Sequence, residues 1–500
     1  MKKRFPLFVG ADIGTQGTKS VVCDVDGNII GEGFAPSSLV YSDNGGVWEA
    51  AESILAGVVA SLKKAVSVAG VNPRDVAALS FDSQMAGLMA IDKDFNAVLP
   101  LDSWLDERCA PYTDELWEKL GDDAILKSGG QFVHSHASRM LRLKRECPEL
   151  YEKTAKFIQP NAFVAGKICD LKAEQAFIDY TFLHFNVFSD NLNKRIDGDK
   201  LALLGISEDK MPKIVSPFDE AGKTSKTFEE ETGISEGTPV FAGCGDTAAS
   251  ALGSGITRKG LAYDVAGTAS VFACCTEKFE PDVKNKTLLY ARSAIDGLYT
   301  PLSYVSGGGL CLKWFSEITG AGYDVLDKEA ENAKAAEEGL FFIPHFSGRS
   351  FPLDDGMRGG FVGITQKTTR GAMYRAIMEA LAFEYRIYSD ILASCGAIDN
   401  ISAVYGVGGG AKSRVFSKIK ADILNAEYRA LKIADSAPRA AAVIAASGAG
   451  FLNEPIAEFF SPERIKAESF MPDGKRYSGL EKEYLNAAEC SYRQKRFERR

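Results

Sequence analysis

An aspartate and a turn rich in glycine and threonine stand together in GADIGTQGTKS, residues 10–20. The turn separates two apolar runs, PLFVGA and SVVCDV, so we expect it to join two buried strands. Backbone N–H groups in such a turn form a nest that binds phosphate oxygens. We expect the hydroxyls of Thr15 and Thr18 to face the same concavity, with Lys19 adding a positive charge. Asp12 ends the first strand and could hold Mg²⁺ through water, because Mg²⁺ takes few protein ligands.

Two further glycine-rich turns follow predicted strands later in the chain. AGTAS spans residues 266–270, and GVGGGAKS at 406–413 leaves a strand and opens a helix, a common place for a nucleotide. Each turn alone is explained equally well by a tight hairpin. Three such turns at strand ends, in two halves with one plan, favour the binding of nucleotide phosphates.

A second aspartate, Asp246, lies in PVFAGCGDTAAS, where a strand runs through a glycine turn into a helix of small residues. This arrangement places Asp246 at the N-terminus of that helix. Capping the helix is the common role of aspartate at such a position. The alternative is catalytic, because transfer of a phosphoryl group to a hydroxyl needs a carboxylate that accepts the hydroxyl proton.

The elements around these residues predict an α/β protein. Three strands open the chain, joined in part by the Asp-Gly turn of DVDGNII, and residues 49–70 have helical periodicity that ends at Gly70. Residues 262–275 repeat the strand–turn–strand plan of the N-terminus, and later patterns predict a helix over 371–396, a strand over 401–407 and a helix over 415–425. We therefore expect two related domains, residues 1–254 and 255–500, with a cleft between them.

Composition excludes several classes of protein. A chain of 500 residues is too long for one core, and 45% hydrophobic with 25% charged residues is ordinary for a globular protein. The net charge of −9 argues against a nucleic acid or an anionic membrane as partner. No apolar run approaches the ~18 residues of a membrane helix, and the basic, apolar start stops at Asp12, so we interpret it as a strand. The ten cysteines include no C-x-x-C pair, which predicts reduced thiols and a cytoplasmic location.

Over nearly its whole length the chain resembles the FGGY carbohydrate kinases, and most of all the xylulokinases among them. The matching stretches are GADIGTQGTKS, SQMAGLMAID, SWLDERC, GCGDTAASALGSG, DVAGTAS, FIPHFSGRSFP and GVGGGAKSRVFSKIKADILN. Their order is that of the family, and the last stretch is highly specific for it. The resemblance implies the actin-like ATPase fold, in which two duplicated ribonuclease H-like domains flank an interdomain cleft, and it implies ATP and Mg²⁺ as cofactors.

The resemblance also implies a role for each residue that matches a family motif. Asp246 corresponds to the catalytic base and Asp12 to the residue that organises Mg²⁺. The implied nucleotide contacts are Thr15, Gln16, Gly17, Gly267, Thr268, Gly309, Lys313, Gly409, Gly410 and Arg414, with Gly410 and Arg414 beside the adenine.

The implied contacts to the sugar depart from the family pattern. The xylulokinase loop G-Q-M-H-G reads SQMAG here, so Met85 and Ala86 occupy the contact positions and the histidine is absent. Asp106 and Thr247 match other positions near the sugar. His134 and His136 lie where the family sometimes contacts its substrate, and a packing role is equally open for both. SGRSFP also differs from the usual SGERTP.

The expected activity is ATP-dependent phosphorylation of a sugar hydroxyl, with a ketopentose such as D-xylulose as the first candidate. Another polyol, ketose or sugar acid, such as glycerol, ribulose or gluconate, is the second enzymatic interpretation. An actin- or chaperone-like ATPase module is the non-enzymatic one, and dependence of ATP turnover on added sugar would distinguish them. The partner is a small molecule, with no nucleic acid or membrane, and a homodimer stays open.

Overall fold

The computed structural model describes residues 5–133, 135–267, 269–346, 348–349, 354, 356–432, 436–474 and 476–494. The chain forms two compact units. Unit 1 comprises Met1–Gly255, Tyr290–Tyr299 and Ala434–Ser461, and unit 2 comprises Ile256–Leu289, Thr300–Ile433 and Pro462–Arg500. No helix in the described ranges is both long and apolar enough to span a membrane.

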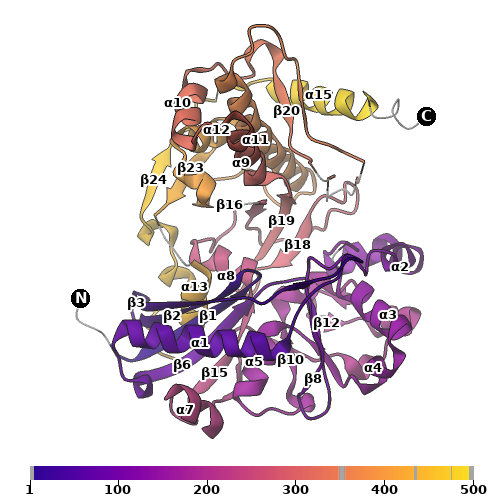
Figure 1. The fold of residues 1–500 in the computed structure, drawn as a ribbon, viewed down its shortest axis with the longest axis vertical. Helices are drawn as coiled ribbons and strands as arrows, with labels where there is room; N and C mark the ends of the chain where they lie inside the picture. The colour runs from indigo at the N-terminus through magenta and orange to yellow at the C-terminus, as the bar shows by residue number, and fades with distance from the viewer. Residues whose placement is uncertain are drawn as a thin grey trace. The chain divides into compact units, whose positions relative to one another are not determined.

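Unit 1 is built on a six-stranded sheet with the order β14-β15-β6-β1-β2-β3 and a smaller five-stranded sheet with the order β4-β5-β8-β7-β9 (Figure 1). The strands of the large sheet are β1 (Leu7–Gly14), β2 (Gly17–Asp24), β3 (Ile29–Pro36), β6 (Val76–Ser83), β14 (Glu220–Lys223) and β15 (Pro239–Gly245). Those of the small sheet are β4 (Val40–Tyr41), β5 (Val47–Glu49), β7 (Leu88–Ile91), β8 (Ala97–Asp102) and β9 (Lys156–Ile158).

The helices of unit 1 are α1 (Ala51–Ala69), α2 (Tyr112–Ser128), α3 (His136–Glu146), α4 (Pro148–Lys153), α5 (Pro160–Ile168), α6 (Gly198–Leu204), α7 (Lys226–Thr232), α8 (Asp246–Gly253), α13 (Ser436–Gly448) and α14 (Ile456–Phe459). Short strands complete it: β10 (Phe177–Asp179), β11 (Ser189–Asp190), β12 (Arg195–Ile196) and β13 (Lys213–Val215). Strand β18 (Leu289–Arg292), where the chain passes from unit 2 into unit 1, is the edge strand of the seven-stranded sheet β18-β19-β17-β16-β22-β23-β24. The predicted helix over 49–70 is confirmed as α1, which ends where Gly70 takes a left-handed conformation with φ 58°.

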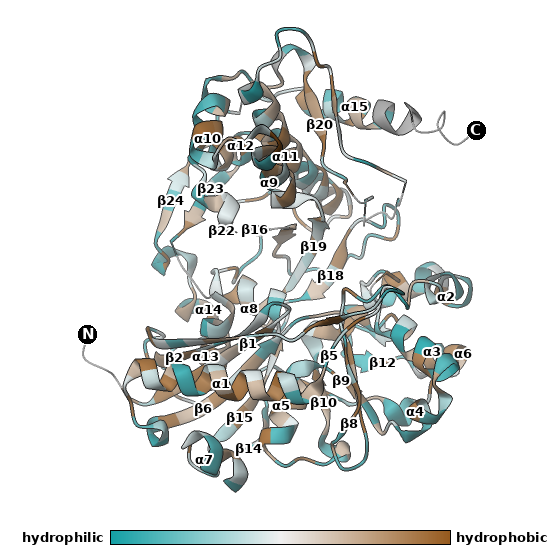
Figure 2. Cartoon of the chain, viewed as in Figure 1, coloured by the Kyte–Doolittle hydropathy of each residue, from teal (hydrophilic) through white to brown (hydrophobic). Residues whose placement is uncertain are grey.

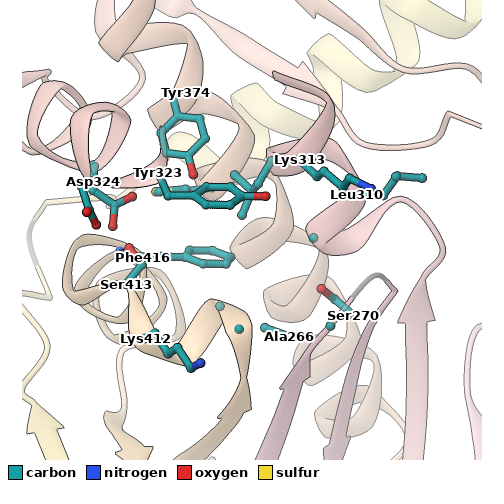
Figure 3. Close-up of a pocket in the computed structure, with 17 residues that line it drawn as sticks. Ala266, Ser270, Leu310, Lys313, Tyr323, Asp324, Tyr374, Lys412, Ser413 and Phe416 are labelled. Carbon is teal, nitrogen blue, oxygen red and sulfur yellow. Dashed lines mark hydrogen bonds between the residues drawn. The ribbon is translucent and has the colours of Figure 1, made fainter. Parts of the chain in front are cut away.

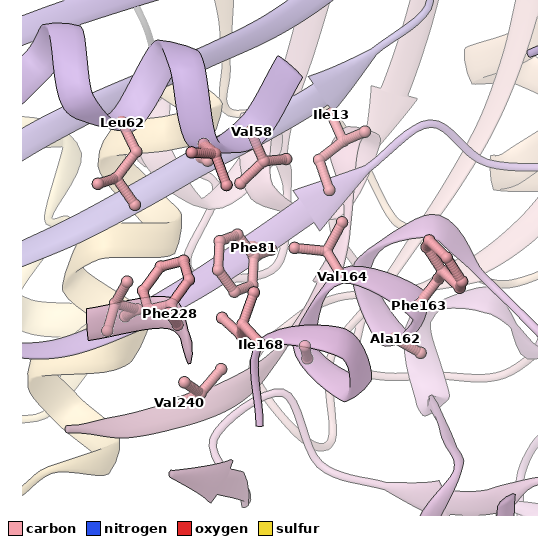
Figure 4. Close-up of a cluster of buried hydrophobic side chains, with 14 of the residues drawn as sticks. Ile13, Val58, Leu62, Phe81, Ala162, Phe163, Val164, Ile168, Phe228 and Val240 are labelled. Carbon is pink, nitrogen blue, oxygen red and sulfur yellow. The ribbon is translucent and has the colours of Figure 1, made fainter. Parts of the chain in front are cut away.

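Alternation along β1 divides its side chains between two helical layers. Ile13 and the other odd-numbered residues pack with Val58 and Leu62 of α1 in the core that Figure 4 shows. Phe8 faces the other way and packs with Ala442 and Ala445 of α13. Hydrophilic and hydrophobic residues mix along α1 (Figure 2), as expected of a helix with one face on a sheet. Even-numbered residues of β1, Asp12 among them, therefore lie on the α13 side.

Unit 2 contains the strands β16 (Leu261–Ala266), β17 (Ser270–Cys274), β19 (Tyr299–Val305), β20 (Phe341–Ile343), β21 (Gly360–Val362), β22 (Ala403–Gly408), β23 (Glu427–Leu431) and β24 (Ala467–Phe470). Its helices are α9 (Gly308–Thr319), α10 (Tyr323–Asn332), α11 (Arg370–Ser394), α12 (Arg414–Leu424) and α15 (Leu480–Gln494). The helices predicted over 371–396 and 415–425 are confirmed as α11 and α12.

The two units share one sheet plan, as the repeated sequence pattern predicts. In unit 1, β15, β6 and β1 are parallel neighbours, and β2 and β3 continue the sheet antiparallel. In unit 2, β23, β22 and β16 are parallel neighbours, and β17 and β19 continue antiparallel. Each unit thus places a tight turn after its central parallel strand, between β1 and β2 or between β16 and β17.

Candidate active site

Three carboxylates meet at the carboxyl end of the parallel strands of unit 1. Asp12 of β1 pairs in register with Asp82 of β6, and Cys244 of β15 pairs with Asp82 on its other side. Residues in register across a sheet point to the same face, so Asp12 and Asp82 lie side by side. Asp246 follows two residues after Cys244 and is the first residue of α8.

Asp246 is half-buried, and its surroundings favour the neutral, protonated form of its carboxyl group. Burial, and then the charge of Asp12, raise the pKa of Asp246 to about 7, while the Thr247 hydroxyl, which donates to its Oδ1 over 3.1 Å, acts in the opposite direction. A carboxylate with a pKa near neutrality accepts a proton readily at physiological pH. The geometry suits a general base. The capping interpretation is not supported, because Asp246 is the first residue inside α8 and the N-cap is Gly245, which has no side chain to cap the helix.

Asp82 was not among the residues selected from the sequence. Its side chain is fully buried, and burial, Asp12 and Asp246 together raise its pKa well above the ordinary range. The signal that could have found it is an aspartate inside the apolar run ALSFDS, where a buried charge demands a partner.

The turn between β1 and β2 closes tightly through Gly14 paired with Gly17, whose φ is 155°. The Thr15 hydroxyl accepts from Trp104 Nε1 over 2.8 Å, and Gln16 is exposed. Thr18 corrects one expectation: its hydroxyl lies against α1, 3.6 Å from the position of a Cβ built on Gly57, rather than in the concavity with Thr15. Lys19 lies 3.4 Å from Glu32.

The SQMAG loop follows β6 and lies beside Asp246. The side chain of Met85 packs on Gly245, the residue before Asp246, since a Cβ built there would lie 2.5 Å from the Met85 methyl carbon. Ala86 is buried with φ 60°, a left-handed conformation that is rare for alanine. Arg139 holds it by donating from Nε to the Ala86 carbonyl over 2.9 Å while its Nη1 pairs with Asp102.

Several buried polar atoms near this loop have no hydrogen-bond partner within the described part of the protein. They include both amide atoms of Gln84, the Oε1 of Gln159 and Nη2 of Arg139. Because such atoms cost free energy unless something bonds them, they are candidates to meet a polar ligand. Sequence analysis missed Gln84 although it lies inside the quoted loop.

Two other residues predicted near the sugar, Asp106 and His136, are now placed. Asp106 is buried, and its carboxylate accepts from the backbone N–H of Val47 over 2.8 Å and from Arg108, which lowers its pKa. His136 is buried, with Nδ1 2.6 Å from the Asn186 Oδ1 and a pKa that burial lowers to about 4. It therefore stays neutral. His134 and Thr268 lie outside the described residues.

In unit 2 a cavity of about 500 Å³ lies between the helices α9, α10 and α12 and the ends of β16 and β22. Figure 3 shows the rings of Tyr323 and Phe416 one above the other, with Asp324 at one end and Lys313 at the other. The lining residues include Gly267, Gly309, Lys313, Gly409 and Gly410, five of the predicted nucleotide contacts.

Close packing explains one glycine of this cavity, Gly410. A Cβ on Gly410 would lie 2.4 Å from that of Ala266, and Gly309 donates its N–H to the Gly267 carbonyl over 3.0 Å. Lys313 lies 3.7 Å from Glu317. Arg414 does not line the cavity: its exposed side chain pairs with Glu468 and lies over the ring of Phe470.

Phe416 was not predicted from the sequence, and its ring lines the cavity. The ammonium of Lys420 lies 3.9 Å from its ring centroid, on a lysine that is fully buried and paired with Asp264. A cation on one face of a ring draws electron density away from the other. The aromatic residue at this place in α12 could have been found from the helical spacing after GGGAKS.

No group of three or more side chains among the described residues is arranged to hold a metal ion. Mg²⁺ needs fewer than three protein ligands because it keeps several waters. After burial, the charge of Asp12 raises the pKa of both Asp82 and Asp246, and Asp246 adds to the shift at Asp82; a cation would relieve that repulsion. The residues present thus fit a magnesium ion bound mainly through water.

The chain matches known proteins along most of its length. Residues 7–253 match the N-terminal domain of the FGGY family of carbohydrate kinases, and residues 262–449 match the C-terminal domain. The chain is similar to the xylulose kinase of Bacillus subtilis (strain 168), with 27% identity over 470 residues, 93% of this chain and 92% of the relative. It is also similar to the gluconokinase of that organism, with 26% identity over 437 residues, 84% of this chain and 83% of the relative.

Among solved structures, the xylulose kinase from Rhodospirillum rubrum has the same fold, with a TM-score of 0.88 at 22% identity over 99% of this chain and 100% of that chain. The family match supports a sugar kinase over an ATPase module without a sugar substrate. The chain therefore belongs to the FGGY family of carbohydrate kinases, for which ATP is the implied phosphoryl donor, and it is a carbohydrate kinase.

Proposed function

We propose that this kinase transfers the γ-phosphoryl group of ATP to a hydroxyl of a ketopentose such as D-xylulose, with Asp246 as the general base. The observation that carries the proposal is Asp246 itself: a carboxylate with a pKa near 7, beside the SQMAG loop. It would accept the proton of the hydroxyl as that oxygen attacks phosphorus.

The cavity of unit 2 supports nucleotide binding. We propose that a purine lies between the rings of Tyr323 and Phe416, and that the phosphates lie beside the glycine backbone around Gly267 and Gly309. We propose Gly409 and Gly410 as contacts to the base or ribose. Gly17, with Thr15 and Gln16, would contact phosphate through the turn after β1, and Lys19 would add charge there. Thr18 would support that turn from the α1 side.

Mg²⁺ would bind at Asp12 through its waters, where the ion would offset phosphate charge in the transition state. Asp12 would thus orient the hydrated ion and leave Asp246 free to accept the proton. In the same proposal the protein acts in the cytoplasm, which its buried, unpaired cysteines such as Cys274 and Cys275 fit.

The sugar would lie against Met85, Ala86 and Thr247, near the buried amide of Gln84. The carboxylate of Asp106 already serves Val47 and Arg108, so it would act on the sugar mainly by fixing this loop. Relatives named xylulose kinase favour D-xylulose, a neutral substrate that amide and hydroxyl groups can bind.

A sugar acid such as gluconate is the second candidate. It is favoured by one observation: the Nη2 of buried Arg139 has no partner in the described structure and lies on the same guanidinium edge as the Nε that bonds Ala86. A substrate carboxylate would pair with it. The gluconokinase relatives agree with this alternative.

A coupled assay of ADP release over ketoses, polyols and sugar acids tests the proposal. D-xylulose should give the highest kcat/KM, and ATP turnover should depend on added sugar. Preference for gluconate would select the second candidate, and Arg139→Lys should then lower kcat/KM for gluconate more than for D-xylulose. Equal ATP turnover with and without every sugar would overturn both.

A further inference from the structure

A buried polar network links the ends of the two strands that carry the base and the sugar loop. Its centre is Asp179, at the end of β10, whose side chain is fully buried. One arm of the network runs through Thr181 to Gly245, and the other runs through Asn161 to Ser83. Asp179, Thr181 and Asn161 are not among the site residues named above.

The Thr181 arm ends on the residue that precedes the base. Both the hydroxyl and the backbone N–H of Thr181 donate to the Asp179 Oδ1, over 2.5 and 3.0 Å. The same hydroxyl oxygen accepts the backbone N–H of Gly245 over 2.9 Å. The one hydroxyl proton of Thr181 is used on Asp179, so its oxygen is oriented to accept from Gly245. The last residue of β15 is therefore held in one position.

The Asn161 arm ends on the residue that precedes Gln84. The Asn161 Nδ2 donates to the Ala242 carbonyl over 3.1 Å and to the Asp179 Oδ2 over 3.4 Å. Its Oδ1 accepts from the Ser83 hydroxyl over 3.2 Å. Asn161 is 1% exposed and Ser83 and Thr181 are 0% exposed, so water does not compete for these bonds.

We propose that Asp179 is a positioning residue for the phosphoryl transfer, acting through Thr181 on the base Asp246 and through Asn161 on the sugar loop. The inference rests on the proposed role of Asp246. Gly245 and Asp246 are joined by one peptide bond, so a shift of Gly245 moves the carboxylate. Misplacement of a catalytic group by about 1 Å can cost on the order of 10²-fold in rate.

The two arms predict different kinetic defects. Thr181→Val keeps the shape of the side chain but removes both hydrogen bonds of the hydroxyl, so it should lower kcat by about 10- to 100-fold with the sugar KM within about two-fold. Thr181→Ser restores the hydroxyl and should recover most of kcat. Asn161→Leu should mainly raise the sugar KM, because it frees Ser83 and the loop that follows it.

Thr232→Val is the matched control. The hydroxyl of Thr232 also donates to a backbone carbonyl, of Phe228 over 2.7 Å, and accepts a backbone N–H, of Ile234 over 3.2 Å, in a buried part of unit 1. It touches no site residue. Thr232→Val should lower the melting temperature about as much as Thr181→Val does, while its kcat stays within about two-fold of wild type.

The experiment measures kcat, sugar KM and melting temperature for these variants, together with hydrogen exchange of the Gly245 amide. Faster exchange and lower kcat in Thr181→Val, restored in Thr181→Ser, support the proposal. Unchanged kcat in Thr181→Val, or an equal loss in Thr232→Val, overturns it. If the wild type phosphorylates no sugar, the proposed function fails on that result, and slow Gly245 exchange in Thr181→Val would separately refute the Thr181 link.

Discussion

At the scale of single residues, the most informative change is Asp246→Asn, which keeps the shape and removes the proposed base. Phosphorylation of the sugar should fall by about 10²- to 10⁴-fold, while nucleotide affinity, which we propose depends on other residues, stays nearly constant. The free energy of unfolding, in contrast, should rise in this variant at neutral pH. Since the folded pKa of Asp246 is raised to about 7, its ionised form costs stability, and that cost is complete above pH 7 and absent near pH 4.

The measurement is single-turnover kinetics with nucleotide titration, plus urea unfolding at pH 8 and pH 4. Asp246→Asn should be more stable than wild type at pH 8 and not at pH 4. Near-normal turnover in the folded variant would remove Asp246 from the mechanism.

The same pKa predicts the pH profile of the wild type. The base must be ionised to accept a proton, so kcat/KM should rise through about pH 7 and level off above it. The residual rate of Asp246→Asn should lack this inflection. The assay should use a coupling enzyme that is stable from pH 5.5 to 8.5, about three pH units around the inflection. A wild-type profile that is flat over this range would contradict a base with this pKa.

Ala86 is the residue where substrate preference is most open. Ala86→His would restore the histidine of the xylulokinase loop, at a φ of 60° that histidine adopts more readily than most residues. If the native substrate is not D-xylulose, the variant should gain kcat/KM on D-xylulose relative to the native substrate. Both substrates are to be measured in both proteins. Loss on D-xylulose, if that is already the best substrate, would make Ala86 a neutral variant.

At the scale of elements, the sequence predicted more of the fold than of the site. Periodicity and turn residues located the strands around Asp12, the helix that ends at Gly70 and the strand–turn–helix that presents Asp246, because these are local properties. The predicted direction of the Thr18 side chain was wrong. That direction depends on strand alternation counted from the turn, and the sequence did not determine the length of the turn. Asp82 and Thr181 were missed, because the contacts that make them important join segments distant in the sequence: Asp82 pairs with Asp12 of β1, and the Thr181 hydroxyl accepts from Gly245 of β15.

Strand β3 and helix α1 show a contact that only small residues allow. A Cβ on Gly33 would lie 2.0 Å from the Ser61 carbonyl of α1, and one on Gly31 would lie 2.3 Å from that of Ala65. Gly33→Ala should therefore push α1 off the sheet and lower the free energy of unfolding by about 1–3 kcal/mol.

Gly360→Ala is the matched control for that change, because a Cβ at Gly360 meets nothing within 4 Å. Urea denaturation of both variants measures the difference. A loss in Gly360→Ala as large as in Gly33→Ala would mean that the close approach of α1 does not explain the effect, because the lower chain entropy of alanine by itself stabilises the folded state.

At the scale of the whole molecule, duplication gives each unit an aspartate at the same place, two residues before its central strand ends. Asp12 occupies this position in β1, and Asp264 occupies it in β16. Their surroundings have diverged. Asp12 faces Asp82 and lies near Asp246, whereas Asp264 is fully buried, pairs with Lys420 and accepts from the hydroxyls of Tyr385 and Tyr428 over 2.8 and 2.7 Å.

Removing each aspartate should therefore have opposite consequences. Asp264→Ala leaves Lys420 buried without its counter-charge, which should cost about 3–5 kcal/mol of folding free energy. Asp12→Ala removes a carboxylate that repels its neighbours, so stability should hold or rise, while turnover falls and its dependence on Mg²⁺ weakens without a change in sugar preference. Urea unfolding and Mg²⁺ titration of kcat separate the two outcomes. An Asp12→Ala protein with an unchanged Mg²⁺ titration would refute the magnesium role, and equal destabilisation by both substitutions would mean that the duplicated position is structural in both units.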